Sequence, residues 1–372
     1  MDTSGSVPAP AVAGSELADL VGEHGPFATV YLTTSASIDN AAQRSLQRWK
    51  TARSDLEVQG APDTILDDIE ALVGSAHQHG ECLVAIASAD RIVHVEHMPD
   101  PPKRDVARWS ALPVYGPLVE WHQQAVPHVV VLIDRSGADL LAFQRVGPDF
   151  VREIEGDDNP LTKSKPGGWS QLRHQRRAEN TWEHNAKEVA SALSDLVNEV
   201  DARLVVVAGD VRAVHMLRDD LDRDVDNMVR VVDGGRAVDG SADDIAGEAT
   251  KLVATVAASE TRALLEKFRE ERGQRDRAAD GPVATIEALN EARVAVLLVP
   301  GDADLYETAW FGPEPIPIAL SAETLAEMGV ERPDHAPLLD VLIHAAFGGG
   351  AGVRIIPRAA APERGIGAIL RW

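Results

Sequence analysis

The stretch from Arg203 to Asp210, RLVVVAGD, constrains the fold most, because it is a short uninterrupted apolar run between polar ends. Such a run is typical of a strand that is buried on both faces, in a sheet that helices cover on each side. A helical pattern with a 3.6-residue period precedes it, formed by Ala186, Val189, Leu193, Leu196, Val197 and Val200. A further helix, AVHMLRDDL, and a further strand, VRVVDG, follow it. This alternation predicts an α/β fold.

The chain has 372 residues, which is longer than a domain with a single hydrophobic core usually is. We predict three domains: an N-terminal α/β domain over residues 1–126, a middle domain over residues 127–278 and a C-terminal α/β domain over residues 279–372. The middle domain begins with a predicted hairpin, HVVVLIDRSGADLLAFQR. It ends in a predicted long helix from Asp243 to about Arg277, whose charged second half is typical of a helix that bridges domains.

The two terminal regions have strand and helix patterns of their own. In the first, FATVYL predicts a strand, DTILDDIEALVG a helix that ends at Gly74, and ECLVAIAS with RIVHVEHM a strand pair. In the last, the predicted order is helix ATIEALNEA, strand VAVLLVP, helices AETLAEMG and PLLDVLIHAAF, and strand VRIIP, before the ending GIGAILRW.

The formal net charge of the chain is -23, which opposes diffuse binding to nucleic acid unless a local patch reverses the field. One loop does so: TKSKPGGWSQLRHQRR, from Thr162 to Arg177, carries basic residues and no acid. Its adjacent glycines, Gly167 and Gly168, allow the backbone to approach another surface closely. Trp169 offers a stacking surface, worth about 1–3 kcal/mol per base. The loop is therefore predicted to contact RNA; the alternative is a solvated surface loop.

The loop and the residues after it resemble the middle domain of the archaeo-eukaryotic peptide-release-factor superfamily. There, a Gly-Gly-Gln tip is followed by Ser-x-Leu-Arg, further arginines, a His-Asn pair and a helix. The matching positions are Gly167, Gly168, Ser170, Leu172, Arg173 and Arg176, with His184 and Asn185 matching after a shift of one residue. IEALNEARVAVLLVP and GIGAILRW resemble the third domain of the family. GPFATVYL and the overall layout resemble the actinobacterial members of the bacterial branch, which are similar to the ribosome hibernation factor Balon.

The resemblance implies a three-domain α/β architecture, with an RNase H-like middle domain and a kink-turn-ribosomal-protein-like C-terminal domain. It also implies a place for the loop in the peptidyl-transferase centre, where the glutamine of the family helps to position the attacking water. Trp169 stands at that place here. An indole has no amide and donates one N–H, so it can stack and obstruct but is poorly suited to orient a water. Gln171 could reach over, but a shift of 1 Å can cost about 100-fold in rate.

We therefore expect a ribosome hibernation or translation-inhibiting factor that occupies the A site without hydrolysing peptidyl-tRNA, and hence no enzyme and no catalytic residue. The alternatives are a release or rescue factor that hydrolyses peptidyl-tRNA, and a stress-related scaffold that binds only proteins. The predicted rRNA-binding residues are Lys163, Lys165, Gly167, Gly168, Trp169, Ser170, Gln171, Arg173, His174, Arg176 and Arg177.

The partners that the resemblance implies are 23S and 16S rRNA and a translational GTPase, elongation factor Tu or a relative, which faces the third domain. A second basic cluster, on a predicted helix of the first domain, is the candidate for contact with small-subunit RNA near the decoding centre; a solvated helix face is the alternative. Its members are Arg44, Arg48, Lys50 and Arg53. No cofactor, metal, membrane or DNA partner is predicted.

Other candidate sites have weaker patterns. His77, His79 and Cys82 lie close together, but a zinc site normally needs four ligands and the chain has one cysteine. His94 and His97 should point to opposite faces of one strand. Asp134 and Asp139 flank the hairpin and suggest a nuclease-type metal pair, although acids at such positions are usually turn formers. FGGGAG, at 347–352, is typical of a helix end.

The predicted compartment is the cytoplasm. The single cysteine fits a reducing environment. The first residues, MDTSGSVPAPAVAG, lack the basic start and apolar run of a signal peptide. No apolar stretch approaches the roughly 18 residues that a membrane span would need.

Overall fold

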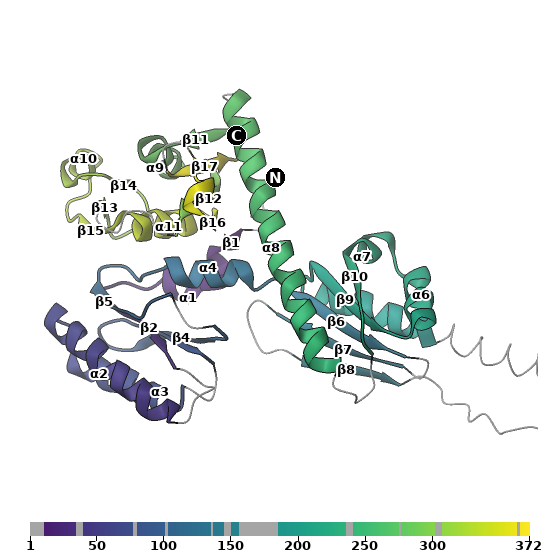
Figure 1. The fold of residues 1–372 in the computed structure, drawn as a ribbon. Helices are drawn as coiled ribbons and strands as arrows, with labels where there is room; N and C mark the ends of the chain where they lie inside the picture. The colour runs from purple at the N-terminus through teal and green to yellow at the C-terminus, as the bar shows by residue number, and fades with distance from the viewer. Residues whose placement is uncertain are drawn as a thin grey trace, which may run out of the picture. The chain divides into compact units, whose positions relative to one another are not determined.

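The computed structural model describes residues 11–34, 40–76, 80–100, 103–134, 137–144, 150–155, 185–235, 241–274, 277–301, 307–362 and 365–372. The chain divides into two compact units (Figure 1). Residues 1–123 and 261–372 form one, the terminal unit, and residues 124–260 form the other, the middle unit. The first and third predicted domains thus lie in one compact unit, and the division into three domains stays a prediction.

The middle unit is built on a five-stranded sheet in the order β10-β9-β6-β7-β8. Strand β9 is parallel to β6 and to β10, whereas β6, β7 and β8 pair antiparallel. The strands are β6 (His128–Ile133), β7 (Gly137–Phe143), β8 (Phe150–Glu155), β9 (Leu204–Gly209) and β10 (Val229–Val232). The predicted hairpin and the predicted buried strand are therefore confirmed; β8 was not predicted.

Helices cover both faces of this sheet, as the apolar run of β9 requires. On one face Val205 and Val207 pack in a core with the helix over residues 185–199 and with α6 (Val211–Asp220) and α7 (Arg223–Met228). On the other face Leu204 and Val206 pack against Ile245 and Ala249 of α8 (Ser241–Gln274), the predicted long helix. The α/β class is confirmed, while the RNase H-like and kink-turn-like descriptions of the separate parts stay predictions.

The terminal unit contains a four-stranded antiparallel sheet in the order β4-β3-β2-β5. Alternate side chains of β2 face different cores: Ala28, Val30 and Leu32 face α2 and α3, whereas Phe27 and Tyr31 face the opposite side. The elements are β2 (Phe27–Thr33), α2 (Ala41–Gln59), α3 (Asp63–Ala76), β3 (Cys82–Ala87), β4 (Ile92–Met98) and β5 (Val106–Ser110).

The predicted end of α3 at Gly74 is wrong. The helix continues to Ala76, because Val73 and Ala76 are buried in the core under the sheet and hold the last turn in place. A glycine costs about 1 kcal/mol relative to alanine in a helix, which such burial outweighs.

A second, mixed sheet of the terminal unit has the order β1-β16-β12-β17-β11. Its edge strand β1 comes from the first residues of the chain and pairs antiparallel with β16. The strands are β1 (Val12–Ala13), β11 (Ala278–Asp280), β12 (Val294–Pro300), β16 (Gly352–Ile356) and β17 (Gly367–Leu370). A small third sheet joins β13 (Thr308–Phe311), β14 (Ile318–Ala319) and β15 (Asp334–Pro337).

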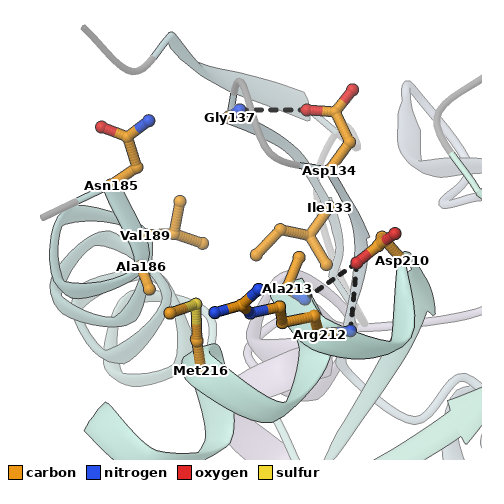
Figure 2. Close-up of a pocket in the computed structure, with 10 residues that line it drawn as sticks. All are labelled: Ile133, Asp134, Gly137, Asn185, Ala186, Val189, Asp210, Arg212, Ala213 and Met216. Carbon is orange, nitrogen blue, oxygen red and sulfur yellow. Dashed lines mark hydrogen bonds between the residues drawn. The ribbon is translucent and has the colours of Figure 1, made fainter. Parts of the chain in front are cut away.

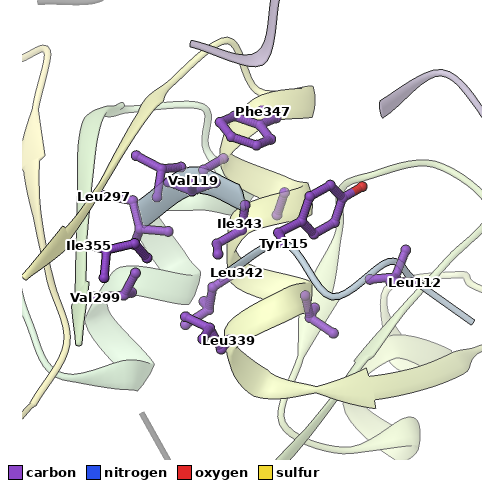
Figure 3. Close-up of a cluster of buried hydrophobic side chains, with 14 of the residues drawn as sticks. Leu112, Tyr115, Val119, Leu297, Val299, Leu339, Leu342, Ile343, Phe347 and Ile355 are labelled. Carbon is purple, nitrogen blue, oxygen red and sulfur yellow. The ribbon is translucent and has the colours of Figure 1, made fainter. Parts of the chain in front are cut away.

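One hydrophobic core unites the two ends of the chain in this unit. Tyr115, which directly precedes α4 (Gly116–Gln124), and Val119 of α4 pack in the same cluster as Leu342 and Phe347 of α11 (Leu338–Gly348) (Figure 3). The remaining helical segments are η1 (Gly14–Leu17), α1 (Ala18–Val21), α9 (Pro282–Asn290), α10 (Ala322–Glu327) and η2 (Arg358–Ala360). In the part of the chain that the structure describes, no helix combines the length and apolarity that crossing a bilayer requires.

Candidate nucleic-acid interface

The predicted RNA-binding loop lies outside the described residues, as do all of its basic residues, Trp169 and His184. The structure describes its two attachment points: β8, which ends at Glu155, and the helix over residues 185–199. Strand β8 pairs with β7 and is the last strand of the middle sheet, so the described residues that precede the loop lie in an edge strand.

A small hollow lies where the helix after the loop meets the carboxyl ends of two strands (Figure 2). Because β6 and β9 are parallel neighbours, the residues that follow them, Asp134 and Asp210, lie at the same edge of the sheet. The hollow is lined by Ile133, Asp134, Gly137, Asn185, Ala186, Val189, Asp210, Arg212, Ala213 and Met216. Its volume of about 10 Å³ is the room of about one water molecule. It is therefore a packed junction, too small for a substrate.

Gly209 makes this junction possible. A Cβ atom at this position would lie 1.9 Å from the carbonyl oxygen of Ile133, so a side chain would collide with the backbone of β6. The close approach lets the backbone N–H of Asp210 reach the same oxygen at 3.3 Å. Sequence reasoning missed this glycine, because its role depends on the parallel pairing of β6 with β9.

Both carboxylates of the junction have local structural roles. Asp134 accepts a hydrogen bond from the backbone N–H of Gly137 at 3.1 Å, which makes it a turn former, as its position in the hairpin favoured. Asp210 caps α6 by accepting from the N–H groups of Arg212 at 3.0 Å and Ala213 at 3.4 Å. Asp139 lies within β7 opposite Leu132 and does not line the hollow. Within the described ranges, no three His, Cys, Asp or Glu residues are grouped so that they could hold a metal.

Asn185 connects the loop to this junction. It is the first described residue after the loop, belongs to the expected His-Asn pair and has 6% of its surface exposed. Arg212 extends from α6 into the same hollow and brings a positive charge to it (Figure 2). The junction therefore holds Asn185, the first described residue after the loop, between two packed helices and the sheet.

The basic residues of α2 do not form one patch. Successive residues of an α-helix are about 100° apart, so Arg44 and Arg48 lie on one flank of the buried stripe and Lys50 and Arg53 on the other. Arg48 is bonded to Asp105 at 3.2 Å. Arg53 forms ion pairs with three carboxylates, those of Glu57, Asp67 and Glu70. Arg44 and Lys50 are exposed. The proposed role of this cluster in RNA contact stays a prediction.

The residues that the sequence suggests as metal ligands, the histidines and Cys82, are not grouped around a common site in the described part of the chain. His77 and His79 lie outside the described residues, and Cys82 is buried in β3, where burial raises the pKa of its thiol to about 12. On β4, His94 lies opposite Ile86 and His97 opposite Leu83, and these two partners belong to cores on opposite faces of the sheet. The prediction that the two histidines face apart is confirmed.

A cluster that the sequence did not indicate joins β4 to α4. Glu96 accepts hydrogen bonds from Nε2 of His122 at 2.9 Å and from Nε2 of His94 at 3.3 Å. Burial raises the pKa of Glu96, but the hydrogen bonds and charges of His122 and His94 outweigh it and lower the pKa to about 2. Both histidines contact the same oxygen, Oε2 of Glu96, so the cluster links β4 to α4 by hydrogen bonds.

Residues 127–274 match the sequence model of bacterial archaeo-eukaryotic release factor family 2. Two relatives from Mycobacterium tuberculosis, the uncharacterized proteins Rv2629 (strain H37Rv) and MT2704 (strain CDC 1551), are 28% identical over 361 residues, which cover 95% of this chain and 95% of each relative.

Several solved structures resemble this chain at lower sequence identity. The archaeal translation termination factor aRF1 has a TM-score of 0.28 at 14% identity, covering 97% of this chain and 99% of that one. Pelota of Archaeoglobus fulgidus has a TM-score of 0.34 at 18% identity, covering 78% of this chain and 79% of its own. A model of ribosome-bound archaeal Pelota and ABCE1 has a TM-score of 0.41 at 13% identity, covering 97% and 95%.

Proposed function

Because this chain belongs to the bacterial branch of the archaeo-eukaryotic release-factor superfamily, we propose that it binds the ribosome at the A site. The observation that carries the proposal is the family match itself, since residues 127–274 include the whole basic Gly-Gly-Trp loop. In a chain with a net charge of -23, a loop that carries five Lys and Arg residues and no acid is the segment best suited to contact RNA phosphates.

The loop would act as a finger directed toward the peptidyl-transferase centre. Lys163, Lys165, Arg173, Arg176 and Arg177 would contact phosphates, and the two glycines would allow close backbone approach. Trp169 would stack on an rRNA base. The junction of Asn185 with α6 supports this role, because a loop delivers a side chain accurately only when its base is held.

We further propose that binding does not release the peptide. Trp169 stands where the family has its glutamine, and an indole cannot supply the amide contacts that orient a water. The result would be a factor that occupies idle or stalled ribosomes and inhibits translation, as in hibernation. Elongation factor Tu or a related GTPase is the proposed delivery partner, α2 would face 16S rRNA, and the cytoplasm is the proposed location.

Two measurements test the proposal. The first adds the protein to ribosomes that carry peptidyl-tRNA and measures free peptide; no release above the uncatalysed background is expected. Release at the rate of a release factor would instead support the hydrolysing alternative.

The second compares co-sedimentation with ribosomes between the parent and a Trp169→Ala, Arg173→Ala variant. The matched control is Arg269→Ala, Trp372→Ala, which also removes one arginine and one tryptophan, both exposed and outside the loop. Loss of binding in the loop variant alone supports the proposal, whereas unchanged binding in both variants would favour the protein-binding scaffold.

A further inference from the structure

A groove of about 440 Å³ lies in the terminal unit, between the segment after β13 and the turn after α10. Protein pockets that bind ligands usually measure about 300–1,000 Å³, so its size is that of a binding site. The groove is lined by Gly312, Pro313, Glu314, Ile316, Pro317, Gly329, Val330, Glu331 and Arg332. It is distinct from the loop and from the junction in the middle unit.

The first wall of the groove is a rigid, proline-rich segment, GPEPIP, at residues 312–317. Its prolines fix the backbone φ angle and leave little entropy to lose on binding. The segment is fastened at its end by Asn290, whose side-chain amide donates to the carbonyl of Ile318 at 2.9 Å and accepts from its N–H at 2.8 Å. Pro315 packs on Gly348 at the end of α11, where a Cβ atom would lie only 2.2 Å from Pro315 Cβ.

The second wall is the turn that ends α10. Its helix is capped by Ser321, whose side chain accepts from the N–H of Thr324 at 3.2 Å. After Gly329, which has a φ of 90°, the N–H of Val330 returns to the carbonyl of Leu325 at 3.0 Å. Both walls are thus held by the fold, so a ligand would not have to order them.

The lining of the groove combines apolar side chains with two acids, Glu314 and Glu331, and one base, Arg332, so its rim has a net negative charge. Ile316 and Val330 are half-buried, while Glu314 and Glu331 are exposed. Neither of these carboxylates forms an ion pair with a residue that the structure describes. The surrounding residues 307–335 include six acids, Glu307, Glu314, Glu323, Glu327, Glu331 and Asp334, against one arginine, Arg332, one histidine, His335, and no lysine. Next to the groove, Met328 leaves 50% of its surface exposed.

We propose that this groove binds an extended, basic segment of a partner protein. An apolar side chain of the segment lies over Ile316 and Val330, and flanking Lys or Arg side chains contact Glu314 and Glu331. The acidic rim selects this occupant, because it repels phosphate and hence RNA, and because complementary charge steers a basic partner toward the groove. The inference concerns a different surface from the loop and does not depend on the proposed ribosome function.

The test uses the full-length protein and a fluorescein-labelled decapeptide of alternating lysine and valine, with binding followed by fluorescence anisotropy. The groove variant is Glu314→Lys, Glu331→Lys. The control variant, Glu266→Lys, Glu287→Lys, changes two exposed carboxylates of α8 and α9 and shifts the net charge equally. We expect the dissociation constant of the decapeptide to rise at least about tenfold in the groove variant and to stay within about threefold of the parent value in the control.

A second variant, Glu314→Gln, Glu331→Gln, keeps the side-chain shapes and removes the charges, so it serves if the lysine variant does not fold. It should bind the decapeptide several-fold more weakly at low salt and differ little from the parent at high salt. Equal loss in the groove and control variants would overturn the proposal, since binding would then follow net charge alone. Equal binding of an alternating glutamate–valine decapeptide, or tighter binding of oligouridine, would overturn it as well.

Discussion

Gln123 and Ile355 exchange two hydrogen bonds, side chain to backbone. Nε2 of Gln123 donates to the carbonyl oxygen of Ile355 at 2.8 Å, and Oε1 accepts from the N–H of Ile355 at 2.8 Å. Strand β1 pairs with β16 only at Gly352 and Val353. At Ile355, which β1 does not reach, the side-chain amide of Gln123 takes the place of a pairing strand. One side chain of α4 thereby pairs with the backbone of β16, two residues beyond the last residue that β1 pairs with.

Replacing Gln123 by alanine should destabilise the terminal unit. The change leaves a buried N–H and a buried carbonyl of Ile355 without this partner, and each unsatisfied group costs about 1–3 kcal/mol. The measurement is the free energy of unfolding in urea. The control is Gln124→Ala, since Gln124 is the next residue, is of the same type and is exposed. Equal loss in the two variants would show that the paired hydrogen bonds contribute nothing specific.

Gly209→Ala should destabilise the middle unit strongly, because the new Cβ atom would lie 1.9 Å from the carbonyl of Ile133. Backbone shifts of this kind cost about 1–3 kcal/mol or more. The control is Gly247→Ala on α8, where a Cβ meets no atom within 4 Å and should stabilise the helix by about 0.5–1 kcal/mol. Thermal unfolding should therefore move in opposite directions for the two variants, and a shift in the same direction would contradict the close approach seen here.

Asp340 and His344, two buried residues of α11, should give opposite pH dependence of stability. Burial raises the pKa of Asp340 to about 7, against the opposing effects of Arg108 and the N–H of Tyr115. Between about pH 4 and pH 7, Asp340 is protonated in the folded state and ionised in the unfolded state. Its contribution to the free energy of unfolding therefore falls as the pH rises. Burial, with the charge of His24, lowers the pKa of His344 to about 4, so this group makes stability rise between pH 4 and pH 6.5.

In the parent, the opposite contributions of Asp340 and His344 to the pH dependence nearly cancel between about pH 4 and pH 6.5. Single variants separate the two contributions. In Asp340→Asn the free energy of unfolding should rise with pH relative to the parent, and in His344→Gln it should fall. Each slope approaches about 1.4 kcal/mol per pH unit at most. The measurement is urea unfolding at several pH values from 4 to 7.5. Parallel profiles for both variants and the parent would rule out this assignment of protons.

On α2, Arg44 and Arg53 should behave differently in ribosome binding. Arg53 is held by the carboxylates of Glu57, Asp67 and Glu70, whereas Arg44 is exposed. If α2 contacts 16S rRNA, Arg44→Ala should weaken ribosome binding and reduce its salt dependence by about one counterion. Arg53→Ala should instead lower stability by about 1 kcal/mol or less, since exposed ion pairs contribute little. Unchanged binding in Arg44→Ala would remove α2 from the interface.

Much of the fold could be predicted because its signals are local. The apolar run at Leu204–Gly209, the hairpin of β6 and β7 and the length of α8 each follow from period and turn residues within a short window. Strand β1 could not be predicted in this way. It has two residues, and its partner β16 lies at the other end of the chain. Strand β5, VARWS, carries polar and apolar residues without a clear alternation.

The chemistry of the candidate site stays a prediction from the sequence, whereas the packing around Asn185 could not be predicted from it. Basic residues, paired glycines and a tryptophan are visible in the sequence, and so is their likeness to a family motif. The junction at Asn185 depends on which strands are neighbours, because the parallel pairing of β6 with β9 brings Asp134 and Asp210, which are far apart in sequence, into the lining of one hollow. The basic residues of α2 divide between two flanks of the helix because successive residues are about 100° apart around its axis. Counting the charges in the sequence does not show this division.

The central claim is that Trp169, on its basic loop, enters the peptidyl-transferase centre and occupies it without cleaving peptidyl-tRNA. The most direct measurement is a cryo-electron microscopy map of the protein on ribosomes that carry peptidyl-tRNA. The account predicts residues 167–169 beside the nucleotides of that centre, with the indole stacked on a base and the ester bond intact. A map in which the protein is bound but Trp169 lies away from the centre, or in which the peptide has been released, would contradict it.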